Sequence, residues 1–312
     1  MRVFLVGHRV PDLDASSGPI EYAEFLVKSK RYDNAEIIPA ICDDINKETK
    51  FIFDKFNVET PRKISASDIS KEDRVILIDH NEEDQRMEGL NSDQVIEIVD
   101  HHKIKINFSS PLRIDVKPLG SVSSVIYENF VKEDITPSTK IASLTLASIL
   151  SDTQGLKATT TTGWDMKAAS DLSKLLNVDV DALTFEIFKA KSGIEGLSHE
   201  EIVRKDYKIF DFSGKRVFIG QVETVEPHKL IELKDGLLKA MEEVKAKEGV
   251  GLLFLTITDV LKINSVMLYV TEEEGKIAEE AFNGVGESNL INIGPRMSRK
   301  KDIAPEIERV IS

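Results

Sequence analysis

The sequence predicts an α/β protein of two domains, an N-terminal one with a mainly parallel sheet flanked by helices and a smaller C-terminal mixed α/β domain. Three observations lead to this fold class. The chain has 312 residues, more than one hydrophobic core usually accommodates. Short apolar runs alternate with helical periodicity in its first part, which is typical of βαβ units. Two glycines without periodicity then indicate a linker at 191–197, so we expect domains at 1–190 and 198–312.

In the first domain, β-branched and aliphatic runs predict strands, and apolar residues at helical spacing predict the helices between them. The predicted strands cover residues 3–6, 36–41, 74–78 and 94–99. The predicted helices cover residues 15–28, 47–56, 121–127, 138–150, 163–176 and 181–191. The serine-rich start of the helix at 121 is interpreted as an N-cap, and binding of an anion by its backbone N–H groups is the alternative.

In the second domain, residues 207–212 and 216–222 flank Ser213-Gly214 and predict a hairpin. One long amphipathic helix is expected over 228–247, followed by strands at 252–258 and 265–270. A short helix should begin at Ala304, with Pro305 in its first turn.

The composition excludes several classes of function. Acidic residues outnumber basic ones by 54 to 41, and the net charge of -13 argues against a non-specific nucleic-acid binder. The single cysteine, Cys42, excludes an intramolecular disulfide and a thiolate metal cage, and fits a reducing compartment. No apolar stretch reaches membrane-spanning length, and the N-terminal run is too short for a signal peptide. We therefore expect a cytoplasmic protein with no membrane partner.

Histidines and aspartates gather at the ends of three predicted strands. The side chains at these ends are His8, Asp12, Asp14, Asp79, His80, Asp100, His101 and His102, and Asp152 follows a helix soon after. Oxygen and imidazole ligands without sulfur favour Mn²⁺ or Co²⁺, with Mg²⁺ possible. The carboxylates exceed what one ion needs, so we expect two ions about 3.5–4 Å apart that are bridged by an aspartate and activate a shared water as hydroxide.

Each of these motifs has an ordinary structural interpretation when taken alone. The turn at residues 8–14 could be a simple polar turn, Asp79 and Asp100 could be N-caps, and Asp152 a loop aspartate. Their joint occurrence favours a metal site, because burying five carboxylates together without cations would cost a large free energy.

Five motifs carry a resemblance to a known family. They are Gly7-His8-x-x-Pro11-Asp12-x-Asp14, Asp79-His80-Asn81-Glu82, Asp100-His101-His102, Ser151-Asp152-Thr153 and Ser298-Arg299-Lys300-Lys301. In this order they resemble the manganese-dependent, family II inorganic pyrophosphatases of the DHH phosphoesterase superfamily, with a DHHA2-type C-terminal domain. The glycine- and histidine-rich motif of superfamily members that act on short nucleic acids is absent, so no nucleic-acid partner is expected.

The resemblance implies that the protein hydrolyses pyrophosphate to two phosphates, with a metal-bridging hydroxide as the nucleophile. The metals would be two Mn²⁺ ions, for which Co²⁺ is a possible substitute. Additional Mg²⁺ bound with the substrate is possible. The resemblance also implies that His8 and Asp12 bind one metal, that Asp14 and His101 bind the other, and that Asp79 and Asp152 bridge them. His102 would face the substrate and would hydrogen-bond or protonate the leaving phosphate. Asp100 would orient a histidine, and His80 would play a supporting part.

The second domain is expected to supply the opposite charge. Lys208, Arg299 and Lys300 correspond to the family's phosphate clamp, which would place the active site in the cleft between the domains. Pyrophosphate has no apolar portion, so cations must recognise it. A solvated basic turn is the alternative for the residues at 299–301. The resemblance also suggests a homodimer.

Some alternatives stay open from the sequence. The family mostly has Asn, Thr and Gln where this chain has Val10, Leu13 and Asp302. An exopolyphosphatase of the same superfamily is the nearest alternative function. A non-catalytic protein that senses metal or phosphate on the same fold is another.

Overall fold

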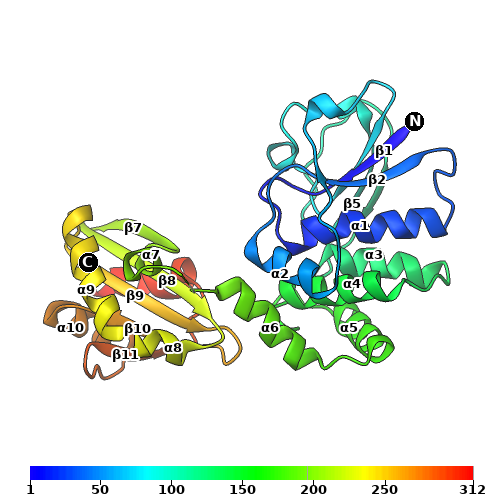
Figure 1. Cartoon of the computed structure of the whole chain (residues 1–312). Coiled ribbons are helices and arrows are strands. Elements are labelled where there is room, and N and C mark those ends of the chain that lie inside the picture. Colours follow the sequence, from blue (N-terminus) through cyan, green and yellow to red (C-terminus); the bar gives the residue numbers. More distant parts are fainter. Residues whose placement is uncertain (195, 312) are drawn as a thin grey trace. The chain divides into compact units, whose positions relative to one another are not determined.

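The computed structural model describes residues 1–194 and 196–311, and the chain forms two compact units, Met1–Ala190 and Lys191–Ser312 (Figure 1). The predicted linker at 191–197 stays a prediction. Helix α6 (Val180–Ser192) continues into its first two residues, and residue 195 lies outside the described residues.

The first unit is built on a six-stranded sheet of order β3-β2-β1-β4-β5-β6, in which every neighbouring pair is parallel. Its strands are β1 (Arg2–Val6), β2 (Glu36–Ile41), β3 (Arg62–Lys63), β4 (Arg74–Ile78), β5 (Val95–Asp100) and β6 (Arg113–Val116). The predicted parallel sheet is confirmed. The edge strands β3 and β6 escape sequence prediction because they are two and four residues long and carry no apolar run.

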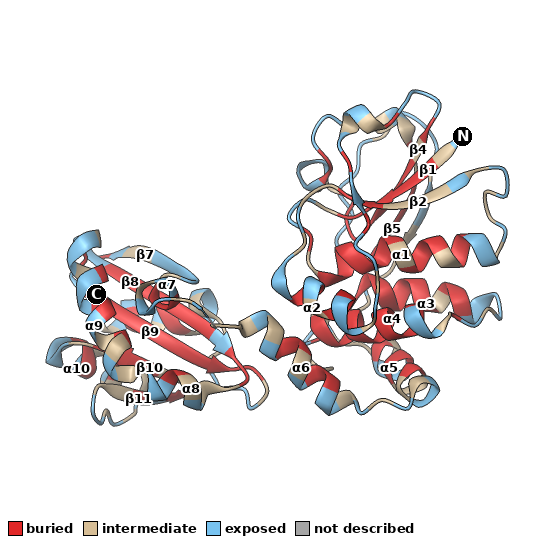
Figure 2. Ribbon diagram, viewed as in Figure 1, coloured by how far each residue is buried: buried red, intermediate tan, exposed pale blue. Residues whose placement is uncertain are grey.

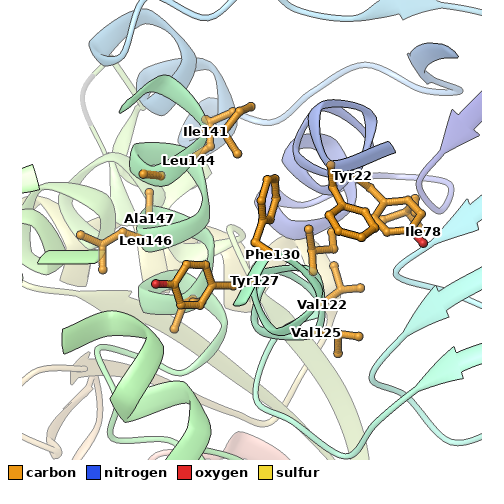
Figure 3. Packing of buried hydrophobic residues seen from close by; sticks show 14 of the residues in the cluster. Tyr22, Ile78, Val122, Val125, Tyr127, Phe130, Ile141, Leu144, Leu146 and Ala147 are labelled. Atoms are coloured by element: carbon orange, nitrogen blue, oxygen red, sulfur yellow. The ribbon is translucent and has the colours of Figure 1, made fainter. Parts of the chain in front are cut away.

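Helices and short 3₁₀ turns surround this sheet. The helices are α1 (Leu13–Lys28), α2 (Lys47–Lys55), α3 (Val122–Lys132), α4 (Thr139–Asp152), α5 (Gly163–Leu176) and α6, and the 3₁₀ turns are Ala66–Asp68, Glu83–Gln85 and Ser92–Gln94. Side chains of α1, α3 and α4, among them Tyr22, Phe130 and Leu144, pack in one core with the sheet (Figure 3). Side chains of α5 belong to the same core, and the rings of Phe25 and Phe130 lie 5.4 Å apart in it. A second core covers the other face, which explains why β1 and β4 are buried on both sides (Figure 2).

The loops that carry the predicted ligands leave the sheet where its strand order reverses. From β1, the chain first adds β2 and β3 on one side of the sheet and then β4, β5 and β6 on the other. The strands β1 and β4 therefore flank a switch point, which is where open parallel sheets bind ligands. The first loop turns so tightly that a Cβ on Gly7 would lie 2.0 Å from the carbonyl oxygen of Ala15. Only glycine therefore lets the chain leave β1 against the first turn of α1.

The second unit contains a mixed five-stranded sheet of order β11-β10-β9-β8-β7, in which β8 and β9 pair in parallel and the other pairs are antiparallel. Its strands are β7 (Tyr207–Phe212), β8 (Lys215–Thr224), β9 (Leu252–Asp259), β10 (Asn264–Tyr269) and β11 (Leu290–Gly294). Its helices are α7 (His199–Val203), α8 (Pro227–Glu232), α9 (Lys234–Glu248), α10 (Glu272–Phe282) and α11 (Ala304–Ile311), with a π-helical turn at Arg299–Ile303. The predicted hairpin is confirmed as β7 and β8.

One element of the second unit differs from its prediction. The single helix expected over 228–247 is two helices, α8 and α9, which meet at Leu233 with φ −86° and ψ 5°, outside the helical region. Leu230 and Leu237 are buried on either side of this break, so the apolar periodicity continues across it and conceals it. Among the described residues, no helix is long and apolar enough to cross a membrane.

Candidate metal centre and phosphate clamp

A first group of possible metal ligands joins the loops after β1 and β4. It consists of His8, Asp12 and Asp79, whose ligand atoms lie within 4.8 Å of one another. Nε2 of His8 is 3.7 Å from Oδ1 of Asp12 and 3.5 Å from Oδ2 of Asp79. Asp12 is held in place as the N-cap of α1, where its Oδ1 accepts a hydrogen bond from the backbone N–H of Ala15.

A second group of the same size lies beside the first and consists of Asp14, His101 and Asp152. Nε2 of His101 is 3.6 Å from Oδ2 of Asp152 and 3.2 Å from Oδ1 of Asp79. Asp79 therefore presents one oxygen to a histidine of each group. Its backbone has φ 64°, a conformation that aspartate tolerates better than most residues.

The residues fit a pair of divalent ions. Oδ1 of Asp79 and Nε2 of His101 are buried, and neither makes a hydrogen bond of acceptable geometry within the described part of the chain. Buried polar atoms without partners are rare in folded proteins, and a bound cation would give both of these atoms a partner. The six side chains offer oxygen and imidazole nitrogen, the donor set that suits Mn²⁺.

The metal-free cluster binds extra protons. Burial raises the pKa of Asp14 and of Asp152, and the neighbouring carboxylates raise both further. Burial lowers the pKa of His8, but its interactions with the carboxylates of Asp12 and Asp79 outweigh this effect and raise it to about 11. Burial also lowers the pKa of His101, but the surrounding carboxylates, Asp79 foremost, raise it to about 10.

Manganese binding is therefore expected to release more than one proton at pH 7, because metal ligands must be deprotonated. The apparent affinity for Mn²⁺ should rise with pH, since the metal-free state holds the protons that the loaded state lacks. Calorimetric titration in two buffers of different ionisation enthalpy measures the released protons. A binding enthalpy that does not change with the buffer would contradict this expectation.

His102 forms a third possible ligand group with Asp79 and His101, and it is held by a chain of hydrogen bonds. Its Nδ1 lies 2.9 Å from Oδ1 of Asp100, whose Oδ2 accepts a hydrogen bond of 2.6 Å from the amide of Asn81. The hydrogen bond to Asp100 raises the pKa of His102, so its half-exposed imidazole can carry a proton. Asn81 was not among the predicted site residues, because a single asparagine in a turn carries no signal of this role.

A cavity of about 490 Å³ opens next to His102. It is lined by His8, Asp79, His80, Asn81, Glu82, Gln85, His102 and Lys103. Burial lowers the pKa of His80 to about 4, so its imidazole is neutral, and its Nδ1 lies 2.9 Å from the carbonyl oxygen of Ile78. His80 thus lines the cavity but belongs to neither ligand group.

In the second unit, Arg299 lies beside the start of β7, the strand that carries Lys208. Nη1 of Arg299 lies 2.9 Å from Oδ1 of Asp206, and the buried Nε of Arg299 has no hydrogen-bond partner within the described residues. Lys208 and Lys300 are exposed, and the ammonium of Lys208 lies 5.3 Å from the ring centre of Phe210. Arg299 therefore has a buried N–H donor without a hydrogen-bond partner among the described residues.

Comparisons with known proteins follow the same division of the chain. The DHH family N-terminal domain matches residues 2–149, and the DHHA2 domain matches residues 185–310. The manganese-dependent inorganic pyrophosphatase of Methanocaldococcus jannaschii is 36% identical over 98% of this chain and 98% of its own. The chain belongs to the family of manganese-dependent inorganic pyrophosphatases.

Further relatives agree with this assignment. The manganese-dependent inorganic pyrophosphatase of Methanothrix thermoacetophila is 32% identical over 98% of this chain and 97% of its own. The crystal structure of a Methanococcus jannaschii protein described as a family II inorganic pyrophosphatase matches with a TM-score of 0.62 and 35% identity, covering 99% of both chains. An exopolyphosphatase-related protein of Bacteroides fragilis, at 16% identity and a TM-score of 0.50, shares the fold over 99% of this chain and 91% of its own.

Two departures from the pyrophosphatase family's usual residues have a structural role. Leu13 is 1% exposed and joins the main core of the first unit.

Oδ2 of Asp302 accepts hydrogen bonds from the backbone N–H groups of Met297 and Ser298 at 3.1 and 2.8 Å. The amide side chain of Gln221 holds the same loop by donating to the carbonyl of Met297 and accepting from the N–H of Arg299. Asp302 and Gln221 thus fix the loop that carries Arg299.

The third departure, Val10, is strained. It has φ 52° and its side chain is 81% exposed, so a β-branched residue occupies the left-handed region without gaining burial. Val10→Asn should stabilise the protein by about 1 kcal/mol, because asparagine tolerates this conformation. Denaturant unfolding of the metal-free protein measures the change. Equal or lower stability of the variant would show that the backbone at this position is not strained.

Proposed function

We propose that this chain hydrolyses inorganic pyrophosphate to two phosphates at a dinuclear manganese centre. The ligands would be His8 and Asp12 for one ion, Asp14 and His101 for the other, and Asp79 and Asp152 for both. The observation that supports this most directly is Asp79, a buried carboxylate with one oxygen near a histidine of each ligand group. The family's curated members named above are manganese-dependent pyrophosphatases.

The roles of the side chains follow from their chemistry. The bound ions would supply Lewis acidity and activate a water for attack. His102, oriented by Asp100, would donate a proton to the leaving phosphate. Arg299, Lys300 and Lys208 would bind the phosphate oxygens and neutralise the charge that develops during phosphoryl transfer. This proposal requires the two units to close on the substrate.

Phosphate release from pyrophosphate, tripolyphosphate and a short oligonucleotide, each with Mn²⁺, Co²⁺ or Mg²⁺, tests the function. We expect release from pyrophosphate with Mn²⁺ or Co²⁺ and none from the oligonucleotide. Faster release from tripolyphosphate than from pyrophosphate would favour an exopolyphosphatase. No release from pyrophosphate with any metal would overturn the proposal.

We expect the chain to form a homodimer and to bind no nucleic acid. The net charge of -13 supports the expected lack of nucleic-acid binding, because polynucleotides would be repelled by most of the surface. Light scattering of the purified chain measures the mass of the assembly.

A further inference from the structure

Residues 119–123 form the turn that leads into α3. They contact Asp14 in the first turn of α1 and His101 after β5, and they lie close to Thr153 at the end of α4. We propose that this turn, named here the 119–123 brace, positions Asp14 and His101, the two ligands that serve one manganese ion alone, and leaves His8 and Asp12, the two that serve the other ion alone, unaffected. The inference rests on the proposed dinuclear centre, and it assigns positioning residues within it.

The brace holds Asp14 through four hydrogen bonds. Oδ1 of Asp14 accepts from the hydroxyls of Ser121 and Ser123 at 3.0 and 2.9 Å, and more weakly from the backbone N–H of Ser123 at 3.4 Å. Oδ2 accepts from the backbone N–H of Val122 at 2.7 Å. The start of α3 therefore binds an anion, and the anion is a side chain of the same chain. These bonds fix the rotamer of Asp14, which is 1% exposed.

The hydroxyl of Ser123 lies between two buried carboxyl groups. Its Oγ is 2.9 Å from Oδ1 of Asp14 and 3.0 Å from Oε1 of Glu21, and it has one proton to donate. Removing this hydroxyl therefore takes a hydrogen-bond donor away from this pair of carboxyl groups.

The brace also orients His101 and lies against the segment of Asp152. Nδ1 of His101 is 3.0 Å from the carbonyl oxygen of Leu119, which makes Nδ1 the protonated nitrogen and leaves Nε2 to face the cluster. A Cβ on Gly120 would lie 2.6 Å from Cγ2 of Thr153, the residue after Asp152. The absence of a side chain at Gly120 therefore lets the brace pack against the end of α4.

Asp165 of α5 holds the brace through a hydrogen bond from the backbone of Gly120. Its two carboxylate oxygens lie 3.1 and 3.0 Å from the backbone N–H of Gly120, and the carboxylate also accepts from the N–H and hydroxyl of Thr162. Asp165 is fully buried, so this bond is shielded from water. The brace is thus tied to two helices and cannot shift without breaking buried hydrogen bonds.

The first ligand group has separate supports. Nδ1 of His8 lies 2.8 Å from the carbonyl oxygen of Arg9, and Asp12 is the N-cap of α1. His8 and Asp12 thus each have a support that lies outside the brace. Removing a hydroxyl from the brace should therefore affect one ion only.

Titration of the metal-free, full-length chain with Mn²⁺ tests this, with free Mn²⁺ followed by electron paramagnetic resonance. In Ser123→Ala we expect one ion to bind as in the parent and the other to bind about tenfold more weakly or worse. Ser124→Ala is the matched control, because its buried hydroxyl on the same helix has no hydrogen-bond partner in the described structure. It should bind both ions as the parent does.

Parental affinity for both ions in Ser123→Ala, or equal weakening of both, would overturn the proposal. Circular dichroism of the metal-free variants checks the fold. If Ser123→Ala does not fold, Ser121→Ala gives the same test, because its hydroxyl also donates to Asp14. The titration needs no turnover, so failure to hydrolyse pyrophosphate would overturn the proposed function and leave this result standing.

Discussion

Asp79→Asn is expected to lower kcat for pyrophosphate by more than about a hundredfold and to abolish tight binding of both manganese ions. Asp79 is 2% exposed, and its oxygens lie 3.5 Å from His8 and 3.2 Å from His101. Asparagine keeps the shape but removes the charge and replaces one oxygen with an N–H donor, which cannot ligate a cation. Steady-state kinetics and Mn²⁺ titration of the variant measure the two effects.

Asp44→Asn is the matched control for this substitution. The side chain of Asp44 is 90% exposed and pairs only with Lys63 at the surface in the described structure, so kinetics and metal binding should equal those of the parent. If Asp79→Asn kept both manganese ions, the two ligand groups would not share this carboxylate.

Arg299→Ala should lower kcat/KM for pyrophosphate by about tenfold to a hundredfold, because a charged hydrogen bond contributes about 1.5–3 kcal/mol. Manganese binding should not change, since Arg299 lies in the second unit and the proposed ligands lie in the first. A loss in kcat would show that Arg299 acts mainly in the transition state, and a rise in KM alone would indicate equal binding of substrate and transition state.

Arg309→Ala provides the comparison for Arg299→Ala. Arg309 is a half-exposed arginine of α11 that pairs with Glu306, in the same unit as the clamp. Its removal should leave kcat/KM unchanged. Full activity of Arg299→Ala would instead indicate that residues 299–301 are a solvated basic turn.

The sequence predicts the parallel sheet and the ligand-type residues well because both leave local signals. Strands β2 and β4 have the bounds that their apolar runs predict, and helix α5 those that its periodicity predicts. The edge strand β6 and the break at Leu233 leave no such signal, since pairing with β5 and a local backbone angle define them. Long-range pairing and single-residue geometry are not encoded in periodicity.

The candidate site shows the same limit. The sequence identifies His8, Asp79 and His101 as candidate ligands because each follows the end of a strand. It does not identify the distant residues that hold the site in place. Ser123 lies 109 positions from Asp14, and Asp165 lies 45 positions from Gly120. Such contacts arise from packing α1 against α3 and α3 against α5. A serine at the start of a helix is interpreted as a cap from sequence alone, and its role toward Asp14 emerges only in three dimensions.

Anomalous diffraction from crystals of the manganese-loaded protein locates the metal ions independently of activity. We expect two manganese peaks per chain, one beside His8 and Asp12, the other beside Asp14 and His101, with Asp79 contacting both. A single peak, or a peak remote from Asp79, would contradict the dinuclear centre.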